Sequence, residues 1–335
     1  MPTFVAGPEN RLFVSAIGRL LPSAANEPIA PPGAPPRVIT IYGPSGVGKT
    51  HVARGLVERW QQERGAESAE YLSASDFRHQ LIDAIKNKSV AEFRQRVCGR
   101  SLLVIDELDR LPLDPYLQQE LRSTADAIEE RGGTLLVAST ESVSVLRNLT
   151  VDVASRLAAG LVLQLLPPGD AAKKQILRRA STAIGRPLSD EAAARLAAGI
   201  RGTASELFGA MFELLADRSL RGTDIERVES YLSLRAARRP TLRNILHAVA
   251  KYCAVPQKLL KSSSRRQSVV LARSIAVYLS RELAGLSYER IGAGLGGRDH
   301  STIMHSYRKI ERLISRDLVT RTTIDELRQT LAGSC

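Results

Sequence analysis

Short apolar runs alternate with stretches of helical periodicity along the first half of the chain. The runs Val38–Tyr42, Leu102–Ile105 and Gly133–Ala138 are apolar at almost every position, which is typical of strands buried on both faces of a parallel sheet. The segments 69–72 and 161–166 indicate two more strands. Helix-compatible stretches lie between them, starting at His51 and covering 74–86 and 90–97. This alternation predicts an α/β domain built on a parallel sheet.

The pattern becomes helical after the Pro167-Pro168 break. Three helical stretches at 171–184, 189–198 and 203–218 predict a small lid. A parallel sheet followed by a helical lid resembles the layout of AAA+ P-loop ATPases. We therefore expect a nucleotide-binding α/β subdomain over 1–167 and a helical lid subdomain over 168–221.

The last third of the chain is predicted to be all-α. A helix over 222–232 and a basic linker, Arg235–Pro240, form a connection over 222–240. Helices at 241–253, 255–261 and 268–283 open the final domain, which we expect over 241–335. Residues 286–310 then read as a short helix, a glycine turn and a longer helix, which is the pattern of a helix-turn-helix.

Charge separates these two parts of the chain. The sequence has 47 Lys and Arg against 35 Asp and Glu, a net charge of +12. Residues 1–234 carry 28 basic and 28 acidic side chains, whereas residues 235–335 carry 19 and 7. A neutral N-terminal part and a basic C-terminal part indicate a soluble enzymatic domain joined to a domain that binds a polyanion. A basic surface that only faces water is the alternative interpretation.

Composition argues against several classes of protein. Three cysteines, Cys98, Cys253 and Cys335, lack the spacing of a zinc site and suit a reducing compartment. No apolar run approaches the roughly 20 residues that span a bilayer, and the N-terminus lacks the pattern of a signal peptide. We therefore expect a cytoplasmic protein. Aromatic residues make up 4% of the chain, so stacking on splayed bases is not the expected mode of binding.

The most specific local motif is a P-loop that fits G-x-x-x-x-G-K-[ST] at every fixed position. Its residues are Gly43, Pro44, Ser45, Gly46, Val47, Gly48, Lys49 and Thr50. A predicted strand precedes it and a predicted helix follows it, so that backbone N–H groups and the helix N-terminus would face phosphates. Lys49 would reach the β- and γ-phosphates of ATP, and the Thr50 hydroxyl would hold Mg²⁺. The alternative is a glycine-rich turn without a ligand.

Polar residues follow two of the predicted buried strands. Asp106 and Glu107 come directly after the run Leu102–Ile105, and Ser139 and Thr140 follow the next run. Ligands of parallel sheets bind at the carboxyl ends of the strands. We expect Asp106 in the Mg²⁺ shell and Glu107 as the group that polarises the attacking water. Ser139 and Thr140 are candidates for sensing the γ-phosphate, and ordinary strand ends are the alternative for both pairs.

Residues 296–310 are the candidate turn and recognition helix. The positions spaced to face inward are Ile303, Tyr307 and Ile310. The other face carries His305, Arg308 and Lys309. Polar residues at the start of this helix are suited to meet base edges, as those of a recognition helix do. A glycine-rich turn alone is weak evidence, and the basic surroundings strengthen the interpretation.

Together these segments resemble the bacterial chromosomal replication initiator family, DnaA. The string Gly-Gly-Arg-Asp-His-Ser-Thr-Ile-Met-His at 296–305 closely matches the family's DNA-binding signature. Further matches extend the resemblance to nearly the whole chain. They are the opening of the ATPase domain (4–11), the P-loop and helix start (46–52), the initiator-specific helical insertion (71–77 and 91–94), the arginine-finger motif (155–157) and the second sensor motif (205–210).

For the nucleotide site, the resemblance implies ATP bound by the P-loop together with His51, and Asn10 in the segment against the adenine. Arg156 would reach the ATP of a neighbouring subunit, which implies a homo-oligomer assembled on DNA. With Lys49, Asp106 and Glu107, Arg156 would complete the catalytic set.

For the DNA interface, the resemblance implies duplex recognition of short repeated boxes. Asp299, His300 and Ser301 would contact bases in the major groove, and Thr302 with the nearby basic residues would hold phosphates. These basic residues are Arg298, His305, Arg308 and Lys309. Arg265 or Arg266 is the candidate for an arginine that enters the minor groove.

The sequence also departs from the family pattern. It begins directly at the ATPase part, so we expect it to lack the family's N-terminal domain and linker, and the helicase-loading partner is unknown. Ser205 stands where the sensor-two arginine is usual, and Asp152 stands where a second arginine precedes the finger. Glu107 replaces the family's usual aspartate. These departures from the family pattern argue against assembly that is controlled by the nucleotide, but they do not argue against ATP binding.

The leading hypothesis is an ATP-dependent initiator that binds origin boxes, oligomerises and opens the adjacent duplex, with slow ATP hydrolysis as a switch. Single-stranded DNA and acidic phospholipid are further partners that the resemblance allows. The alternative is a divergent paralogue that binds DNA as a transcriptional or replication regulator and opens nothing. A metabolic P-loop kinase would explain neither the +12 charge nor the string at 296–305.

Overall fold

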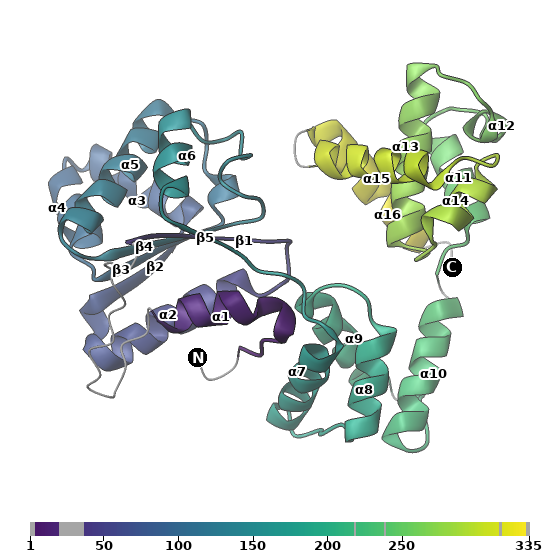
Figure 1. Ribbon diagram of the computed structural model, residues 1–335, viewed down its shortest axis with the longest axis horizontal. Helices are drawn as coiled ribbons and strands as arrows, with labels where there is room; N and C mark the ends of the chain where they lie inside the picture. The colour runs from purple at the N-terminus through teal and green to yellow at the C-terminus, as the bar shows by residue number, and fades with distance from the viewer. Residues whose placement is uncertain (1–3, 20–36, 218, 238, 315–316, 333–335) are drawn as a thin grey trace. The chain divides into compact units, whose positions relative to one another are not determined.

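The structure is a computed structural model that describes residues 4–19, 37–217, 219–237, 239–314 and 317–332. These residues form two compact units with a boundary between Glu229 and Ser230. Figure 1 shows a sheet covered by helices in the first unit and helices alone in the second. Each unit has its own hydrophobic core.

The first unit contains a five-stranded sheet with the order β2-β3-β4-β1-β5. The strands are β1 (Val38–Tyr42), β2 (Ala69–Ser73), β3 (Leu102–Asp106), β4 (Thr134–Ser139) and β5 (Leu161–Gln164), and all pairs are parallel. Every residue of β3 and β4 is buried, whereas the edge strand β5 is half-buried. The apolar runs of the sequence therefore correspond to strands covered on both faces.

Alternate residues of each central strand belong to different cores. Leu103 and Ile105 face the core shared with α3 (Ala74–Lys86), α4 (Val90–Cys98), α5 (Pro115–Glu130) and α6 (Val151–Ala158). Leu102 and Val104 face the core shared with α1 (Arg11–Gly18) and α2 (Lys49–Arg64). Figure 1 shows these two helical layers on opposite sides of the sheet. The predicted α/β fold with a parallel sheet is confirmed, and α1, α5 and α6 are additions to the expected elements.

Local sequence fixes where several of these helices begin. Ser73 and Asp76 form a reciprocal capping box at the start of α3. Asp114 accepts a hydrogen bond from the N–H of Leu117 at 2.9 Å, and Pro115 follows it at the first position of α5. Short 3₁₀ turns at Pro8–Asn10, Ala66–Ser68 and Leu108–Arg110 complete the connections.

The lid consists of α7 (Asp170–Ala183), α8 (Asp190–Gly199) and α9 (Ala204–Ala216). Buried leucines and alanines on the three helices, such as Leu177, Leu196 and Leu207, hold them together. The next helix, α10 (Asp224–Ala237), is longer than the stretch 222–232 predicted for it. The first residues of the predicted linker are therefore helical, because Arg235 continues the helix and donates a hydrogen bond to the Tyr231 hydroxyl at 2.6 Å.

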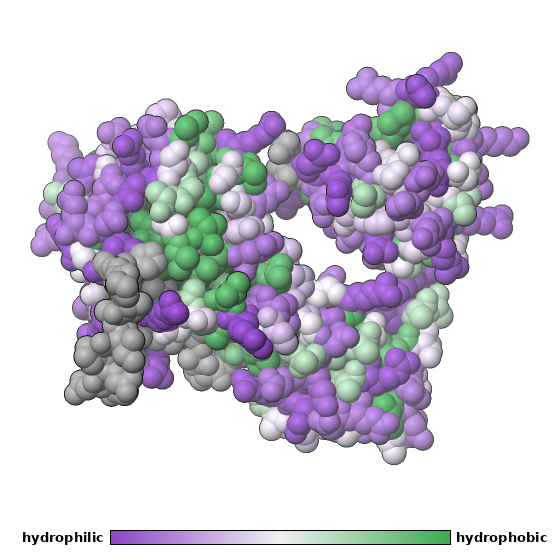
Figure 2. Space-filling view, in the orientation of Figure 1, coloured by the Kyte–Doolittle hydropathy of each residue, from purple (hydrophilic) through white to green (hydrophobic). Residues whose placement is uncertain are grey.

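The second unit continues with α11 (Leu242–Tyr252), α12 (Gln257–Lys261), α13 (Gln267–Glu282), α14 (Tyr288–Gly294), α15 (His300–Ile314) and α16 (Leu318–Ala332). Helix α13 is its centre, since every residue from Ala272 to Ser280 is buried. Figure 2 shows a mostly hydrophilic surface on this unit, and a band of hydrophobic residues on the first unit near β5 and α6. Within the described ranges, no helix has the length and hydrophobicity to cross a bilayer.

Candidate nucleotide site and DNA interface

The P-loop connects the end of β1 to the start of α2. Gly46 and Gly48 have φ angles of +80° and +109°, in the left-handed region where glycine is favoured. A Cβ atom on Gly46 would lie 2.7 Å from Thr203 Oγ1 and 2.9 Å from Ser205 Oγ. The lid therefore packs directly on the loop, and a larger residue at Gly46 would separate them.

Lys49 is the buried cation of this loop, with 9% of its surface exposed. Its Nζ donates hydrogen bonds to the carbonyl oxygens of Gly43 at 2.7 Å and Pro44 at 3.0 Å. Burial lowers the pKa of Lys49, whereas the charges of Asp109 and other nearby acids act to raise it. An ammonium group held in this way is placed to bind an anion inside the loop.

Asp106 lies at the carboxyl end of β3 and is 1% exposed. Its Oδ2 accepts hydrogen bonds from the Thr50 hydroxyl at 2.5 Å and from the Tyr71 hydroxyl at 2.9 Å. Its Oδ1 accepts one from the N–H of Glu107 at 2.7 Å. Burial raises the pKa of Tyr71, and the Asp106 charge adds to this shift. The hydroxyl and carboxylate oxygens of Thr50 and Asp106 are the ligand types that fit Mg²⁺.

Glu107 has a left-handed backbone, with φ of +56°. This conformation is uncommon for a residue other than glycine, and strain of this kind is concentrated at functional sites. The Glu107 carboxylate lies 3.1 Å from Arg110 Nη1 and is partly exposed. Next to it, Asp109 accepts a hydrogen bond from the N–H of Thr140 at 2.9 Å. The turn after β3 thus brings carboxylates to the same end of the sheet as the P-loop.

A pocket of about 760 Å³ lies over the P-loop and collects most of the residues expected there. The expected residues that line it are Asn10, Ser45, Gly46, Val47, Gly48, Lys49, Thr50, His51, Asp106, Glu107 and Thr140. Phe4, Val5 and Phe208 add apolar walls. A phosphate-binding loop beside apolar surface fits a nucleotide in both size and chemistry.

Four expected residues contribute differently. Gly43 and Pro44 present their carbonyl oxygens to Lys49. Ser139 is buried, and its hydroxyl donates to the carbonyl oxygen of Glu141 at 2.6 Å, so that it closes a strand end. Asn10 lines the pocket and also joins α1 to the lid connection through two hydrogen bonds of 2.9 Å with the backbone of Leu166.

In the second unit, α14 and α15 are joined by a tight glycine turn. Gly296 and Gly297 have φ angles of +89° and +73°, and a Cβ atom on Gly296 would lie 2.2 Å from the carbonyl oxygen of Lys261. Ile303 and Ile310 of α15 are buried. Tyr307 stacks on Tyr278 at 5.4 Å between ring centroids and donates a hydrogen bond to Glu282 at 2.8 Å. The helix therefore presents its polar positions outward.

A groove of about 710 Å³ runs between the start of α15 and the loop before α13. Of the expected DNA-binding residues, Arg265, Arg298, Ser301, Thr302 and His305 line it. The serines 262–264, Lys261 and Arg273 complete its polar wall. The other expected DNA-binding residues do not line this groove; they are Arg266, Asp299, His300, Arg308 and Lys309. Two segments that are far apart in sequence thus border one basic groove.

Asp299 has a local role in addition to any contact with a base. Its Oδ1 accepts a hydrogen bond from the N–H of Ser301 at 2.8 Å, which lowers the pKa of Asp299. Nδ1 of His300 lies 3.2 Å from the same oxygen. Asp299 therefore caps the start of α15, where His300 and Ser301 are exposed.

Arg273 is a residue of the groove that was not among the expected ones. It is 6% exposed, and its guanidinium donates to the carbonyl oxygens of Leu259, Leu260, Ser262 and Ser264 at 2.8–3.2 Å. Burial lowers the pKa of Arg273, and the charge of Arg298 acts in the same direction. Arg273 holds the loop that carries Arg265. The signal in the sequence was an arginine between the apolar stretches Val269–Ala272 and Ile275–Leu279 of one helix.

Comparison with known proteins matches both units. The family model described as the bacterial DnaA ATPase domain covers residues 1–164, and that of the bacterial DnaA helix-turn-helix covers residues 242–310. The chromosomal replication initiator protein DnaA of Citrifermentans bemidjiense is 30% identical over 334 residues, which are 98% of this chain and 71% of that protein. The DnaA protein of Geobacter sp. strain M21 matches equally well.

The chain belongs to the bacterial DnaA family. It is a P-loop ATPase of the AAA+ fold with the helix-turn-helix DNA-binding domain of this replication initiator family.

Solved structures have the same fold. AMPPCP-bound DnaA from Aquifex aeolicus has a TM-score of 0.60 and 22% identity, covering 99% of this chain and 96% of that one. Replication initiator DnaA bound to AMPPCP and single-stranded DNA has a TM-score of 0.59 and 21% identity, covering 99% and 97%. Domain III of the Thermotoga maritima DnaA covers 69% of this chain and 93% of its own, with a TM-score of 0.59 and 24% identity.

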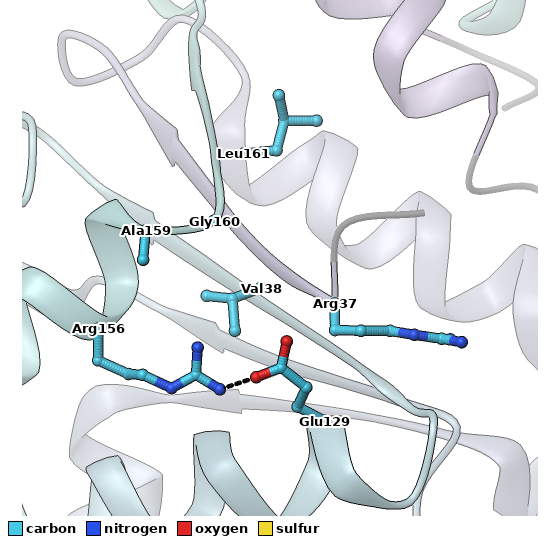
Figure 3. A pocket seen from close by; sticks show the side chains of 7 residues that line it. All are labelled: Arg37, Val38, Glu129, Arg156, Ala159, Gly160 and Leu161. Atoms are coloured by element: carbon cyan, nitrogen blue, oxygen red, sulfur yellow. Dashed lines mark hydrogen bonds and ion pairs between the residues drawn. The ribbon is translucent and has the colours of Figure 1, made fainter. Parts of the chain in front are cut away.

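Arg156, the candidate arginine finger of this DnaA-family chain, lies outside the nucleotide pocket. It projects from α6 and pairs with Asp126, at 2.5 Å, and with Glu129, both on α5. Figure 3 shows Arg156 directed at Glu129 beside a separate pocket of about 350 Å³. Asp152, one turn earlier on α6, lies 3.3 Å from Arg122. The finger candidate is therefore held by acidic groups of its own chain.

Other residues of the DnaA-family nucleotide pocket were also missed from the sequence. Arg54, Asp109, Arg110 and Arg179 line the pocket, and Tyr71 contacts the pocket residue Asp106 through its hydroxyl. Arg54 follows Thr50 by one helical turn, so its position was accessible from periodicity. Tyr71 reaches Asp106 because β2 pairs with β3, and strand order is not visible in a local motif.

Proposed function

We propose that this chain is an ATP-dependent replication initiator that binds short repeated boxes in duplex DNA, assembles on them with ATP and promotes opening of the adjacent duplex. The observation that carries the proposal is the groove bordered by Arg265 and by Ser301, Thr302 and His305. A recognition helix and a basic loop on one groove suit simultaneous contact with a major groove and a neighbouring minor groove.

At the nucleotide site, we assign Lys49 and the N–H groups of the P-loop to the phosphates of ATP. Thr50 and Asp106 are the proposed ligands of Mg²⁺, supported by their 2.5 Å hydrogen bond. Glu107 is the proposed group that orients the attacking water, supported by its place beside Asp106 at the edge of the pocket. Slow hydrolysis would then act as a switch, because ADP and ATP would differ in their support of assembly.

At the DNA interface, His300 and Ser301 are the proposed base contacts, with Asp299 orienting the helix start through its hydrogen bond to Ser301. Thr302, His305, Arg308 and Lys309 are the proposed phosphate contacts. Arg265 is favoured over Arg266 for the minor groove, because it lines the groove. A related initiator has been solved with single-stranded DNA, and we propose the opened strand as a further ligand of this chain.

A second candidate function is that of a DNA-binding regulator that opens nothing. The observation that favours it is the pairing of Arg156 with Asp126 and Glu129, since assembly through an arginine finger requires that these ion pairs break. Ser205 adds to it, because its short neutral side chain replaces the usual arginine. Its backbone N–H donates a hydrogen bond to the carbonyl oxygen of Gly46 at 3.2 Å.

The deciding experiment measures assembly on DNA. A box is first selected from a random duplex pool with the purified protein, and four copies are then arrayed on one duplex. Binding is followed with ATP, with ADP and without nucleotide at one fixed salt concentration, because protein–DNA affinities depend steeply on salt. Cooperative assembly with ATP alone supports the initiator. Binding that is indifferent to the nucleotide supports the regulator, and failure to select any box contradicts both.

A further inference from the structure

Among the described residues, four cationic side chains line the nucleotide pocket: Lys49, Arg54, Arg110 and Arg179. Three of them have internal partners. Lys49 donates to the carbonyl oxygens of the P-loop, the Arg54 guanidinium lies 4.6 Å from the centre of the Tyr71 ring, and Arg110 pairs with Glu107. Arg179 forms no ion pair or hydrogen bond with another residue of the described ranges, and it is exposed to the pocket. A cation of this kind is available to a ligand.

Arg179 projects from a well-fixed face of α7. Ile176, Ala180 and Ala183 line the same pocket, at the spacing of residues that share one face of a helix. Leu177 is fully buried in the lid, and the Lys173 ammonium donates to the carbonyl oxygen of Ile200 at 3.0 Å. The neighbouring Arg178 faces elsewhere, because it pairs with Asp190 of α8 at 3.0 Å. Two adjacent arginines of one helix therefore have different surroundings.

Among the described lid residues, no second positively charged side chain lines this pocket. The lid residues that line it are Ile176, Arg179, Ala180, Ala183, Ala204, Ser205 and Phe208. Ser205 is uncharged, and its hydroxyl lies 3.5 Å from the carbonyl oxygen of Gly46. Its short side chain is thus directed at the P-loop backbone. Among these residues, Arg179 alone matches the charge of a polyphosphate.

We infer that Arg179 is the lid residue that binds the phosphate chain of the nucleotide and couples the lid to its presence. The inference rests on nucleotide binding at the P-loop. A guanidinium group that keeps its charge and carries several donors is suited to phosphate oxygens. Because Arg179 belongs to the lid and Lys49 to the α/β subdomain, a phosphate chain held by both would tie the two together.

The test measures the dissociation constants of ATP and ADP, by competition with a fluorescent ADP analogue, for the full chain and three variants. Arg179→Ala removes the charge, Arg179→Lys keeps it, and Arg178→Ala is the matched control on the same helix. We expect Arg179→Ala to raise the dissociation constant of ATP about tenfold, because a loss of this size is typical when one charge-assisted hydrogen bond is removed. Arg179→Lys should recover most of this loss, and Arg178→Ala should stay within about twofold of wild type.

Two further readouts separate a phosphate contact from a structural role. The salt dependence of ATP binding should be shallower in Arg179→Ala than in wild type, since one charge contact is lost. The melting temperature without nucleotide should be unchanged, whereas the increase that ATP produces should be smaller. Equal ATP affinity in Arg179→Ala and Arg178→Ala would overturn the inference, as would a loss that Arg179→Lys does not repair. Absence of ATP binding in wild type would instead contradict the proposed function itself.

Discussion

The nucleotide site and the DNA groove of this chain are built in opposite ways. In the first, Lys49 and Asp106 are 9% and 1% exposed, and their polar atoms already have partners in the protein. In the second, Arg265, His300 and His305 are exposed and stand on a scaffold that is itself buried, with Arg273 beneath the loop and Ile303 beneath the helix. A buried site requires particular residues at particular positions, whereas an exposed one needs a rigid support and a suitable charge.

The largest expected effect separates the two sites. Lys49→Ala should weaken ATP binding by roughly 100-fold or more, because the buried ammonium is the loop's own cation for phosphate. Binding of a single selected box should stay within about twofold of wild type, since the DNA groove lies in the other unit. Isothermal titration with ATP and an anisotropy assay with the duplex measure both. Loss of duplex binding as well would show that the sites are not independent.

The next effect concerns the support of the DNA groove. Arg273→Ala should destabilise the second unit by about 2–3 kcal/mol, because buried carbonyl oxygens lose a charged donor. It should also weaken binding to selected and random duplexes alike, since the loop with Arg265 loses its anchor. Denaturant unfolding and duplex titration test this, with the exposed Arg243→Ala as a control of equal charge. Equal behaviour of the two variants would exclude a supporting role for Arg273.

A smaller effect is expected for a side chain on the exposed surface itself. His300→Ala should cost about 1–3 kcal/mol on the selected box and little on random duplex, because a base contact discriminates between sequences. Lys309→Ala provides the contrast, since loss of a phosphate contact weakens both duplexes similarly and makes the salt dependence shallower. A His300→Ala loss of the same size on both duplexes would make His300 a structural residue.

The smallest effect is expected for Tyr71→Phe, at the buried nucleotide site. Tyr71→Phe removes one hydrogen bond from Asp106 Oδ2, while the Thr50 hydroxyl still donates to the same oxygen. We expect a loss of about 1 kcal/mol in the free energy of unfolding and nearly unchanged ATP affinity. Chemical denaturation and nucleotide titration measure the two quantities. A large loss of ATP affinity would mean that the Tyr71 hydroxyl, rather than Thr50, keeps Asp106 in place.

The difference between the two sites also explains which of their features could be predicted from the sequence. The strands were visible because strands covered on both faces need continuous apolar runs, and the P-loop because its turn needs glycine at Gly46 and Gly48. The capping role of Asp299 and the anchoring role of Arg273 were not visible, because they depend on which backbone groups lie near a side chain. Ion pairs across helices, such as Arg156 with Glu129, are also set by packing.

The N-terminal part of the predicted linker shows a similar limit. The segment Arg235–Pro240 was predicted to be a basic linker, yet α10 continues to Ala237. Arginine has a good helix propensity, so a basic stretch does not by itself end a helix. Pro240 is a better sequence signal for the end of this helix than the arginines are. Proline is not tolerated inside a helix, and Pro240 lies shortly after Ala237, where α10 ends.

The most direct test of the proposed initiator function is whether the protein opens DNA. A duplex carrying arrayed selected boxes beside an AT-rich segment is treated with permanganate, which modifies unpaired thymines, in the presence of ATP or ADP. We expect reactive thymines in the AT-rich segment with ATP and wild-type protein, and none with ADP or with Lys49→Ala. Boxes that are fully occupied under both nucleotides while every thymine stays protected would contradict an initiator and identify the chain as a regulator.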